Sequence, residues 1–499
     1  MKLPHPSPLL QSRGDKDLTY NIIVIGCQMN KSDSERIAGY LDNLGFQEVD
    51  HYGSADLVII TSCGVRQSAE DRIYGFAAGI RKENKKAKIL LTGCLSSEKI
   101  VRERLKKFVS IWLPIIELPE LEGKLREVGL IGNEDKPHPN PLLPRRGGYK
   151  DSNYLSLLPK YKSNFSAMVP IGNGCDNFCT YCYVPYARGR ETYRPAEEII
   201  AEVKDLVARG YKEITLIAQN VNSYKSIKSL KSVKSKADEI VGFADLLKMV
   251  NDIPGDFWLR FATNHPKDMD DDLIETIAAC EKACHHIHLP AQAGDDEVLR
   301  RMNRKYTHKH YLELINKIRE SLNSKINPPQ PLPRGEYTPQ PSDGHRREFK
   351  IFNAPASITT DIIVGFPGET EEQFQRTADL FEEVKFDMAY IGQYSPRHRT
   401  IAAKMTDDVS REEKKRREEV LMDILRRTVL ENNQAYLHEV VEILVEGKGR
   451  QGDLIGRTKT NKVVKVLKDN SDLSGVKKGE FALVKITEID SFGLKGELV

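Results

Sequence analysis

Short apolar runs alternate with polar, helix-forming stretches along the first quarter of the chain. The runs NIIVIG, LVII and ILLTG are each followed by a helical pattern: one from Ser32, one over Arg66–Lys86 and one near Ser97–Phe108. Strands that alternate with helices predict a parallel sheet covered by helices. We therefore expect an N-terminal parallel-sheet α/β domain.

The alternation continues through a longer central block, about Ser163–Thr400. Its apolar runs predict six strands: SAMVPI, EITLIA, FWLRFA, HIHL, SITTDIIVGF and DMAYIG. Repeated strand–helix units predict a partial or complete (β/α) barrel. A charged helix is expected over Ser410–Asn432, and the last block, about Gln434–Val499, is β-rich with glycine turns. That block predicts a small all-β barrel.

Three proline-rich segments interrupt this pattern and share a Pro-Leu-Arg-Gly theme. They are His5–Gly14, His138–Gly147 and Asn327–Gly335. Proline interrupts helices and sheet ladders, so we expect exposed loops or tails. We interpret them as one repetitive element inserted at tolerant surface sites. The lysine-rich stretch Lys225–Lys236 predicts a solvated loop.

These features divide the chain into six parts. A disordered tail is expected over 1–17, the N-terminal domain over 18–125 and a linker with an inserted loop over 126–162. The central domain is expected over 163–400 with an insert at about 324–349, a connecting helix over 401–433 and the C-terminal domain over 434–499.

Composition narrows the protein class only modestly. Of 499 residues 39% are hydrophobic, and 75 Lys and Arg against 72 Asp and Glu give a net charge of +3. This balance neither demands nor excludes nucleic acid. No apolar run approaches the roughly 20 residues that span a bilayer, and the N-terminus lacks the apolar core of a signal peptide. We expect a cytoplasmic protein, whose 8 cysteines are reduced metal ligands or buried thiols.

The strongest chemical signal is a central cysteine triplet, Cys175, Cys179 and Cys182. It follows the first predicted barrel strand directly, and active sites of such barrels lie at the carboxyl ends of strands. A zinc site normally needs four protein ligands, and no fourth Cys or His is nearby in sequence. Three thiolates suit a [4Fe–4S] cluster with one open iron, which can bind S-adenosylmethionine (SAM). A zinc knuckle is the weaker alternative.

An outlying cysteine triplet, Cys27, Cys63 and Cys94, ends the three N-terminal apolar runs. Strands of a parallel sheet share one carboxyl edge, so these thiols are expected to converge there. A second iron–sulfur cluster is the favoured interpretation. The alternative is three buried cysteines that act as small hydrophobic side chains.

The C-x3-C-x2-C spacing resembles the radical SAM superfamily, and further motifs resemble its methylthiotransferases. These motifs are Gly26-Cys27-Gln28-Met29-Asn30, Gly93-Cys94, Val184-Pro185-Tyr186, Gln219-Asn220-Val221-Asn222, His288-Leu289-Pro290 and Gly365-Phe366-Pro367-Gly368-Glu369-Thr370. The Gly-Cys-Gln-Met-Asn form is similar to the branch that modifies isopentenyladenosine in tRNA. Gly456-Arg457-Thr458-Lys459-Thr460-Asn461 is similar to the tRNA-binding TRAM domain.

The resemblance implies a reaction with two SAM molecules and two [4Fe–4S] clusters. One SAM gives a methyl group and the other a radical that takes hydrogen from adenine C2, where the methylated sulfur is then transferred. The implied substrate is adenosine 37 of tRNA, beside the anticodon. An electron donor such as flavodoxin or ferredoxin is implied, while the sulfur donor stays open. Threonylcarbamoyladenosine in tRNA, or a ribosomal protein, is the alternative substrate, and a non-catalytic metal- and RNA-binding protein is the alternative class.

Several supporting residues have weaker signals. Tyr181 is implied to lie near the adenine of SAM, while Gln219, Asn220, Gly365 and Gly368 are candidate cofactor contacts at strand ends. The candidate RNA contacts of the C-terminal block are Arg457, Lys459, Lys462 and Lys465.

Other polar residues have two open interpretations. Arg188 and Arg190 are either anion ligands or part of a solvated face.

Cys280 and Cys284 are expected on a helix, in a structural role. The chain departs from the family pattern at Thr61-Ser62-Cys63, at Gln292-Ala293-Gly294-Asp295 and at Arg397-His398-Arg399-Thr400.

Overall fold

The computed structural model describes residues 18–64, 67–132, 154–227, 240–324, 350–449, 452–467 and 475–499. The proline-rich segments His5–Gly14, His138–Gly147 and Asn327–Gly335 lie outside these residues. Most of Lys225–Lys236 does so too. Its first three residues, however, form strand β10 (Lys225–Ile227), which pairs with β11 (Ile240–Gly242). The expectation of a loop was wrong there because a partner strand satisfies the backbone.

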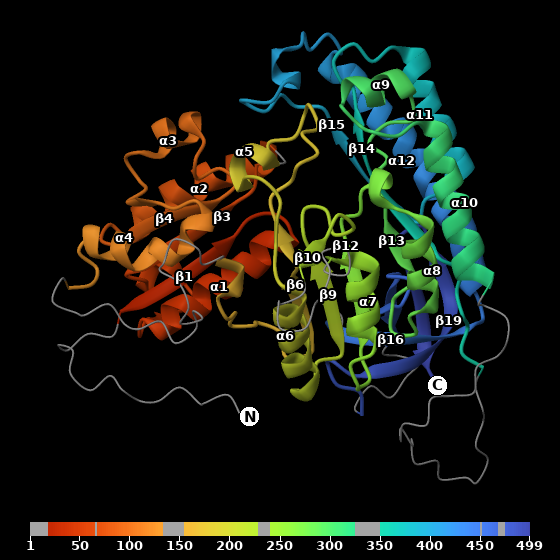
Figure 1. The fold of residues 1–499 in the computed structure, drawn as a ribbon, viewed down its shortest axis with the longest axis horizontal. Helices are drawn as coiled ribbons and strands as arrows, with labels where there is room; N and C mark the ends of the chain where they lie inside the picture. The colour runs from red at the N-terminus through yellow and green to blue at the C-terminus, as the bar shows by residue number, and fades with distance from the viewer. Residues whose placement is uncertain are drawn as a thin grey trace.

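The N-terminal domain is a five-stranded parallel sheet in the order β2-β1-β3-β4-β5 (Figure 1). Its strands are β1 (Thr19–Val24), β2 (Gln47–Glu48), β3 (Leu57–Ser62), β4 (Lys88–Gly93) and β5 (Ile111–Trp112). Its helices are α1 (Gln28–Asn43), α2 (Gln67–Glu83), α3 (Lys99–Leu105) and α4 (Leu121–Glu127). Every residue of β3 is buried, as expected for a central parallel strand covered on both faces.

The central domain is an open arc of six parallel strands, as the sequence predicted. One sheet has the order β12-β9-β6 and the other the order β13-β14-β15, and a bridge between Leu259 and Ala283 joins them. The strands are β6 (Ser166–Pro170), β9 (Glu213–Ile217), β12 (Trp258–Ala262), β13 (His286–His288), β14 (Ser357–Val364) and β15 (Met388–Gln393). The partial form of the barrel is therefore confirmed.

Helices cover the outer face of this arc, and the large hydrophobic core lies between the two layers. They are α6 (Ala196–Ala208), α7 (Phe243–Asn251), α8 (Asp271–Ala279), α9 (Asp296–Arg301), α10 (His308–Ser324), α11 (Glu371–Val384) and α12 (Arg411–Asn433). The N-terminal domain lies beside β6, where α1 contacts that strand (Figure 1). A two-stranded pair, β7 (Gly172–Asn173) and β8 (Thr192–Tyr193), flanks the short helix α5 (Val184–Arg188).

The C-terminal domain is a closed five-stranded barrel in the order β16-β17-β18-β20-β19. Its strands are β16 (Val440–Lys448), β17 (Leu454–Thr458), β18 (Val463–Val466), β19 (Phe481–Asp490) and β20 (Gly493–Leu498). It lies below the central arc in Figure 1, at the end where the arc's strands begin. There Arg260 of β12 donates hydrogen bonds to the carbonyl oxygens of Thr458 (2.8 Å) and Lys459 (3.1 Å). Within the described residues, no helix is both long and apolar enough to cross a membrane.

Candidate active site

The central triplet occupies a tight loop that follows β7 at the carboxyl end of the arc. Its backbone is fixed on both sides, because the Cys175 N–H donates to Gly189 O (3.2 Å) and the Cys182 N–H donates to Cys179 O (3.0 Å). Thr180 anchors the middle of the loop, with its N–H donating to Met302 O (3.0 Å) and its hydroxyl donating to Arg301 O (2.8 Å). The three thiols are therefore presented by a rigid loop.

The surroundings of these thiols fit a metal cluster. Burial raises the pKa of Cys175 to about 11 and raises that of Cys182 further, and neighbouring thiols add to both shifts. Metal binding would hold such thiols as thiolates. Two nitrogen atoms approach the sulfurs: Arg304 Nη1 donates to Cys179 Sγ (3.4 Å) and Asn177 Nδ2 donates to Cys175 Sγ (3.5 Å). Such N–H···S bonds are among the groups that tune iron–sulfur clusters.

The outlying triplet lies at the carboxyl edge of the N-terminal sheet, where β1, β3 and β4 are neighbours. Glycines beside the cysteines allow close approach. A Cβ on Gly26 would lie 2.6 Å from Cys63 Cβ, and one on Gly64 would lie 3.3 Å from Cys94 Cβ. Cys63 and Cys94 are buried, whereas Cys27 is exposed. The structure therefore brings together three thiols that are distant in sequence.

The two triplets are neighbours across the domain boundary. Tyr183, which follows Cys182, packs in the same hydrophobic cluster as Cys63 and Cys94. Burial is the largest cause of the raised pKa of Cys182, and Cys94 contributes to it. Among the described residues no group of three or more His, Cys, Asp and Glu side chains is arranged around one metal ion. Thiolates of a [4Fe–4S] cluster each hold a different iron, so they need not meet at one point.

Unsatisfied acceptors at the carboxyl end of the arc fit a bound SAM. Gln219 Oε1 and Asn220 Oδ1 are buried and accept no hydrogen bond from the part of the chain that the structure describes. They follow β9, and Asn220 Nδ2 donates to Asp268 Oδ2 (2.8 Å). Buried acceptors without donors are costly, and the hydroxyl or amino groups of SAM would satisfy them. Burial and the nearby Cys179 raise the pKa of Tyr181, which keeps its hydroxyl neutral beside the loop.

Gly365 and Gly368 have left-handed backbones after β14, with φ of +67° and +74°. Side chains of this chain occupy the space beside them. A Cβ on Gly365 would lie 2.3 Å from Lys414 Cγ, and one on Gly368 would lie 2.5 Å from Arg301 Nη1. These glycines thus admit packed side chains, and their role toward a cofactor stays a prediction.

The candidate RNA contacts of the C-terminal barrel have partners within the protein. Lys462 Nζ lies 2.6 Å from Asp387 Oδ1, Lys465 Nζ lies 2.8 Å from Asp453 Oδ2, and Arg457 Nε lies 3.4 Å from Glu446 Oε1. The side chain of Lys459 is exposed. A role of this stretch toward RNA stays a prediction.

Other residues lie differently from their sequence-based interpretation. Arg188 is buried and pairs with Asp33, whereas the side chain of Arg190 is 73% exposed. Cys280 and Cys284 are buried, but α8 ends at Ala279, so the expected helix does not carry them. Arg304 has no signal in the sequence, because its contact with Cys179 joins residues that are 125 positions apart.

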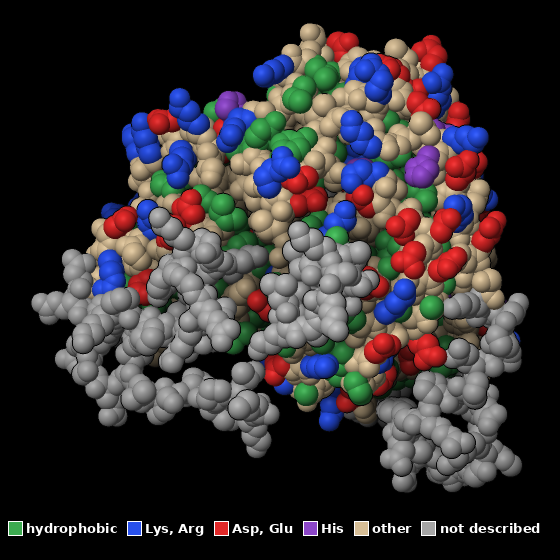
Figure 2. Space-filling model, in the orientation of Figure 1, with side chains coloured by type: hydrophobic (Ala, Val, Ile, Leu, Met, Phe, Trp, Pro, Cys, Tyr) green, Lys and Arg blue, Asp and Glu red, His purple; other side chains and the backbone are tan. Residues whose placement is uncertain are grey.

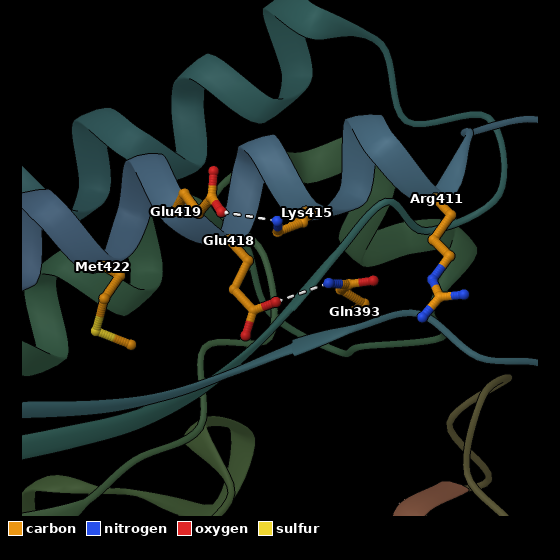
Figure 3. A pocket seen from close by; sticks show the side chains of 6 residues that line it. All are labelled: Gln393, Arg411, Lys415, Glu418, Glu419 and Met422. Atoms are coloured by element: carbon orange, nitrogen blue, oxygen red, sulfur yellow. Dashed lines mark hydrogen bonds and ion pairs between the residues drawn. The ribbon is translucent and has the colours of Figure 1, made fainter.

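A surface hollow of about 360 Å³ lies between α12 and the end of β15 (Figure 3). Its lining residues are Gln393, Arg411, Lys415, Glu418, Glu419 and Met422. Gln393 donates to Glu418 (2.8 Å), and Lys415 lies 3.5 Å from Glu419. No cysteine lines it, so the hollow is separate from the two triplets.

Comparison with known proteins agrees with this geometry. The chain matches the Radical SAM superfamily over residues 169–329, the Uncharacterized protein family UPF0004 over 19–112 and the TRAM domain over 434–499. It is 40% identical to the tRNA-2-methylthio-N(6)-dimethylallyladenosine synthase of Thermoanaerobacter pseudethanolicus, over 97% of this chain and 93% of the relative. The proteins of that name from Syntrophomonas wolfei (39% identical, 97% and 99% covered) and Clostridium botulinum (38%, 95% and 95%) are similar to it as well. The chain therefore belongs to the radical SAM methylthiotransferases, in the family of the tRNA-2-methylthio-N(6)-dimethylallyladenosine synthases.

Proposed function

We propose that this enzyme places a methylthio group on C2 of N6-isopentenyladenosine at position 37 of tRNA, beside the anticodon. The observation that carries the proposal is that Tyr183, the residue after Cys182, packs in one hydrophobic cluster with Cys63 and Cys94 of the outlying triplet. The relatives named for this reaction cover nearly the whole chain and support the same substrate.

In this proposal, Cys175, Cys179 and Cys182 hold one [4Fe–4S] cluster, and Cys27, Cys63 and Cys94 hold the other. When bound, the clusters and SAM supply an electron, a radical that takes hydrogen from adenine C2, and the methylated sulfur. Arg304 orients Cys179 by its hydrogen bond to the sulfur.

The remaining side chains bind SAM. Gln219 and Asn220 accept hydrogen bonds from it, and Tyr181 packs beside its adenine. Gly365 and Gly368 shape the strand end at which it would lie.

The implied partners follow from this chemistry. The substrate tRNA would approach the end of the molecule that carries α5 and α9, where Figure 2 shows lysine and arginine side chains on the upper part of the face. Lys459 and its neighbours on the C-terminal barrel would contact the RNA backbone. A flavodoxin or ferredoxin would deliver electrons, and the cytoplasm, which holds tRNA and these carriers, is the proposed location.

Nucleoside analysis of tRNA from cells with and without this gene tests the substrate. We expect the methylthio derivative of isopentenyladenosine to disappear and isopentenyladenosine to accumulate when the gene is deleted. An unchanged isopentenyladenosine pool, with loss of methylthio groups from threonylcarbamoyladenosine or from a ribosomal protein, would refute the proposed substrate.

Two cysteine variants separate the two proposed clusters. Cys179→Ala is expected to abolish SAM cleavage, whereas Cys63→Ala is expected to spare cleavage and to stop sulfur insertion. The buried Cys284→Ala is the matched control and is expected to keep about eight irons, as two clusters require. Sulfur insertion by Cys63→Ala would show that the outlying triplet is structural.

A further inference from the structure

A buried arginine joins the segments that carry the two triplets. Arg188 is the last residue of α5, the helix that begins two residues after Cys182. Its side chain is 1% exposed. α5 packs against the N-terminal domain, where Ala187 and Tyr183 belong to the same hydrophobic cluster as Cys63 and Cys94. Arg188 therefore lies at the boundary between the two domains.

The guanidinium of Arg188 binds the helix that follows Cys27. Its Nη2 donates to Asp33 Oδ2 (2.6 Å) and to Asn30 Oδ1 (2.9 Å), both on α1. Cys27 is the residue that caps the N-terminus of α1. An ion pair thus connects a helix attached to Cys27 with a helix attached to Cys182.

The same contacts reach two more of the cysteines. Asn30 Nδ2 donates to Ser62 O (3.0 Å), and Ser62 precedes Cys63. Asn173, two residues before Cys175, accepts from Arg188 Nη1 (3.1 Å) and donates to Arg188 O (3.0 Å). One buried network therefore touches the chain next to four of the six cysteines.

The network contains two charged side chains, and they lie close to the outlying triplet. Arg188 and Asp33 are both buried, and the Tyr154 hydroxyl donates to Asp33 Oδ1 (3.2 Å). The side chain of Asn30, whose Oδ1 accepts from Arg188, lies beside the outlying triplet, because a Cβ on Gly26 would lie 2.5 Å from Asn30 Nδ2 and 2.6 Å from Cys63 Cβ. The positive charge of Arg188 is therefore one side chain away from Cys63.

We propose that Arg188 and Asp33 form a positioning pair that fixes the two clusters relative to each other and sets the reduction potential of the outlying one. The inference rests on the proposed function, since it requires a cluster on the outlying triplet. Net charge and hydrogen bonding around a cluster set its potential. In a dry site the charge of Arg188 favours the reduced, more negative cluster, and that of Asp33 opposes it.

The two partners therefore predict opposite shifts. Arg188→Gln leaves Asp33 unpaired and is expected to make the potential of the outlying cluster more negative. Asp33→Asn leaves Arg188 unpaired and is expected to make it less negative. A purely structural pair would shift both variants in the same direction, because either substitution breaks the same contact.

Potentiometric titration of the reconstituted enzyme, followed by electron paramagnetic resonance, measures these shifts. The signal of the outlying cluster is the one that persists when Cys175, Cys179 and Cys182 are replaced by alanine in a parallel sample. Arg209→Gln is the matched control, because it removes the same charge from an exposed side chain that pairs with Asp205 at the end of α6, and we expect no shift. Arg188→Lys retains the charge and is expected to restore the potential.

The positioning role has its own readout, which is the amount of 5′-deoxyadenosine released per methylthio group inserted. Arg188→Gln is expected to raise this ratio several-fold relative to Arg209→Gln. Arg188→Lys is expected to raise it as well, because an ammonium cannot reproduce the paired guanidinium contacts.

Specific results would overturn the proposal. Shifts of equal sign in Arg188→Gln and Asp33→Asn, or shifts no larger than in Arg209→Gln, would refute the charge-setting role. An unchanged ratio in Arg188→Gln would refute the positioning role. If Arg188→Gln fails to retain iron, Asp33→Asn alone tests the charge-setting role. A shift of the outlying cluster to a more negative potential in that variant would refute the role. A wild-type enzyme that cannot be loaded with about eight irons would instead refute the proposed function.

Discussion

Gly26 separates the end of β1 from Cys27, and its missing side chain shapes the outlying triplet. Its φ of +132° disfavours other residues. A Cβ there would lie 2.5 Å from Asn30 Nδ2 and 2.6 Å from Cys63 Cβ. Neither neighbour can move freely, because Asn30 donates to two backbone carbonyls.

We expect Gly26→Ala to lose the outlying cluster while it keeps the central one. The added methyl would push Cys63 away, so iron content after reconstitution would fall from about eight to about four per chain. Gly75→Ala is the matched control: Gly75 lies inside α2 with nothing within 4 Å of an added Cβ. That change is expected to stabilise the protein by about 0.5–1 kcal/mol. Full iron loading of Gly26→Ala would contradict the close packing.

His265 gives the folded protein a specific sensitivity to acid. Burial, with help from Arg304 and Lys267, lowers its pKa from 6.5 to about 2. Its neutral ring Nδ1 accepts from the Lys267 N–H (3.2 Å). Below pH 6.5 the unfolded chain binds a proton at this histidine and the folded chain does not, so the stability of the folded protein falls as the pH drops.

This one histidine is expected to lower the free energy of unfolding by about 1.4 kcal/mol for each pH unit below pH 6.5. The effect fades within about one pH unit above 6.5, where the unfolded histidine becomes neutral too. Urea unfolding at pH 7.0 and 5.5 measures it, and His265→Asn, whose side chain can still accept from Lys267, is expected to remove this part of the loss. His51→Asn is the control, because His51 is exposed. Equal pH dependence of wild type and His265→Asn would contradict a neutral His265.

At the scale of elements, local sequence signals predicted the long strands and helices well. The charged helix expected over Ser410–Asn432 is α12 (Arg411–Asn433), and Ser410 caps it by accepting from the Glu413 N–H (3.1 Å). The six central strands were confirmed in the same way. The short strands β2, β5, β10 and β11 were not predicted. Each is defined by its pairing with a distant strand, and its own sequence is too short to show a pattern.

An arginine and an aromatic pair join β12 to the C-terminal barrel, because the ring of Trp258 also packs on that of Phe481, with ring centroids 4.9 Å apart. Arg260 pairs with Glu213 (2.5 Å) and donates to two carbonyl oxygens at the end of β17 and beyond. Lys462, on the same turn of the barrel, pairs with Asp387. The basic residues of this turn are visible in the sequence, but their contacts with the rest of the protein are defined only by the fold.

We expect Arg260→Ala to destabilise the contact between the domains by about 1–3 kcal/mol, because it leaves the half-buried Glu213 carboxylate without its cationic partner. The C-terminal barrel would then become accessible to limited proteolysis at protease concentrations that leave the wild type intact. Arg426→Ala removes an exposed arginine that pairs with Asp423, and is expected to change stability by less than about 1 kcal/mol. Unchanged proteolysis of Arg260→Ala would show that other contacts hold the barrel.

At the scale of the whole molecule, the sequence predicted the kinds of domain but not their contacts. The six cysteines could be proposed as ligands because each follows an apolar strand or shares a short motif, and that role stays a prediction. Arg304 could not, since only the folded arc brings it to Cys179. Arg188 had two open interpretations, and neither was an ion pair with α1.

We expect deletion of residues 327–348 to leave the reaction intact. The segment is rich in proline, and the neighbouring described residues are already anchored: α10 ends at Ser324 and Ile351 pairs with Val440. Loop-closure entropy changes by only about 0.6 kcal/mol for each doubling of length. Equal iron content, thermal midpoint and tRNA methylthiolation would support the prediction. Lost methylthiolation with full iron content would instead show that the segment contacts tRNA.

The different origins of the two triplets have a consequence for maturation. Cys175, Cys179 and Cys182 belong to one short loop, so a nascent chain can capture iron there before the arc is complete. Cys27, Cys63 and Cys94 meet only after three strands have aligned, so that site can be loaded only in a folded sheet. Iron delivery to this enzyme is therefore expected to proceed in a fixed order, with the outlying centre filled last and lost first when the sheet is loosened.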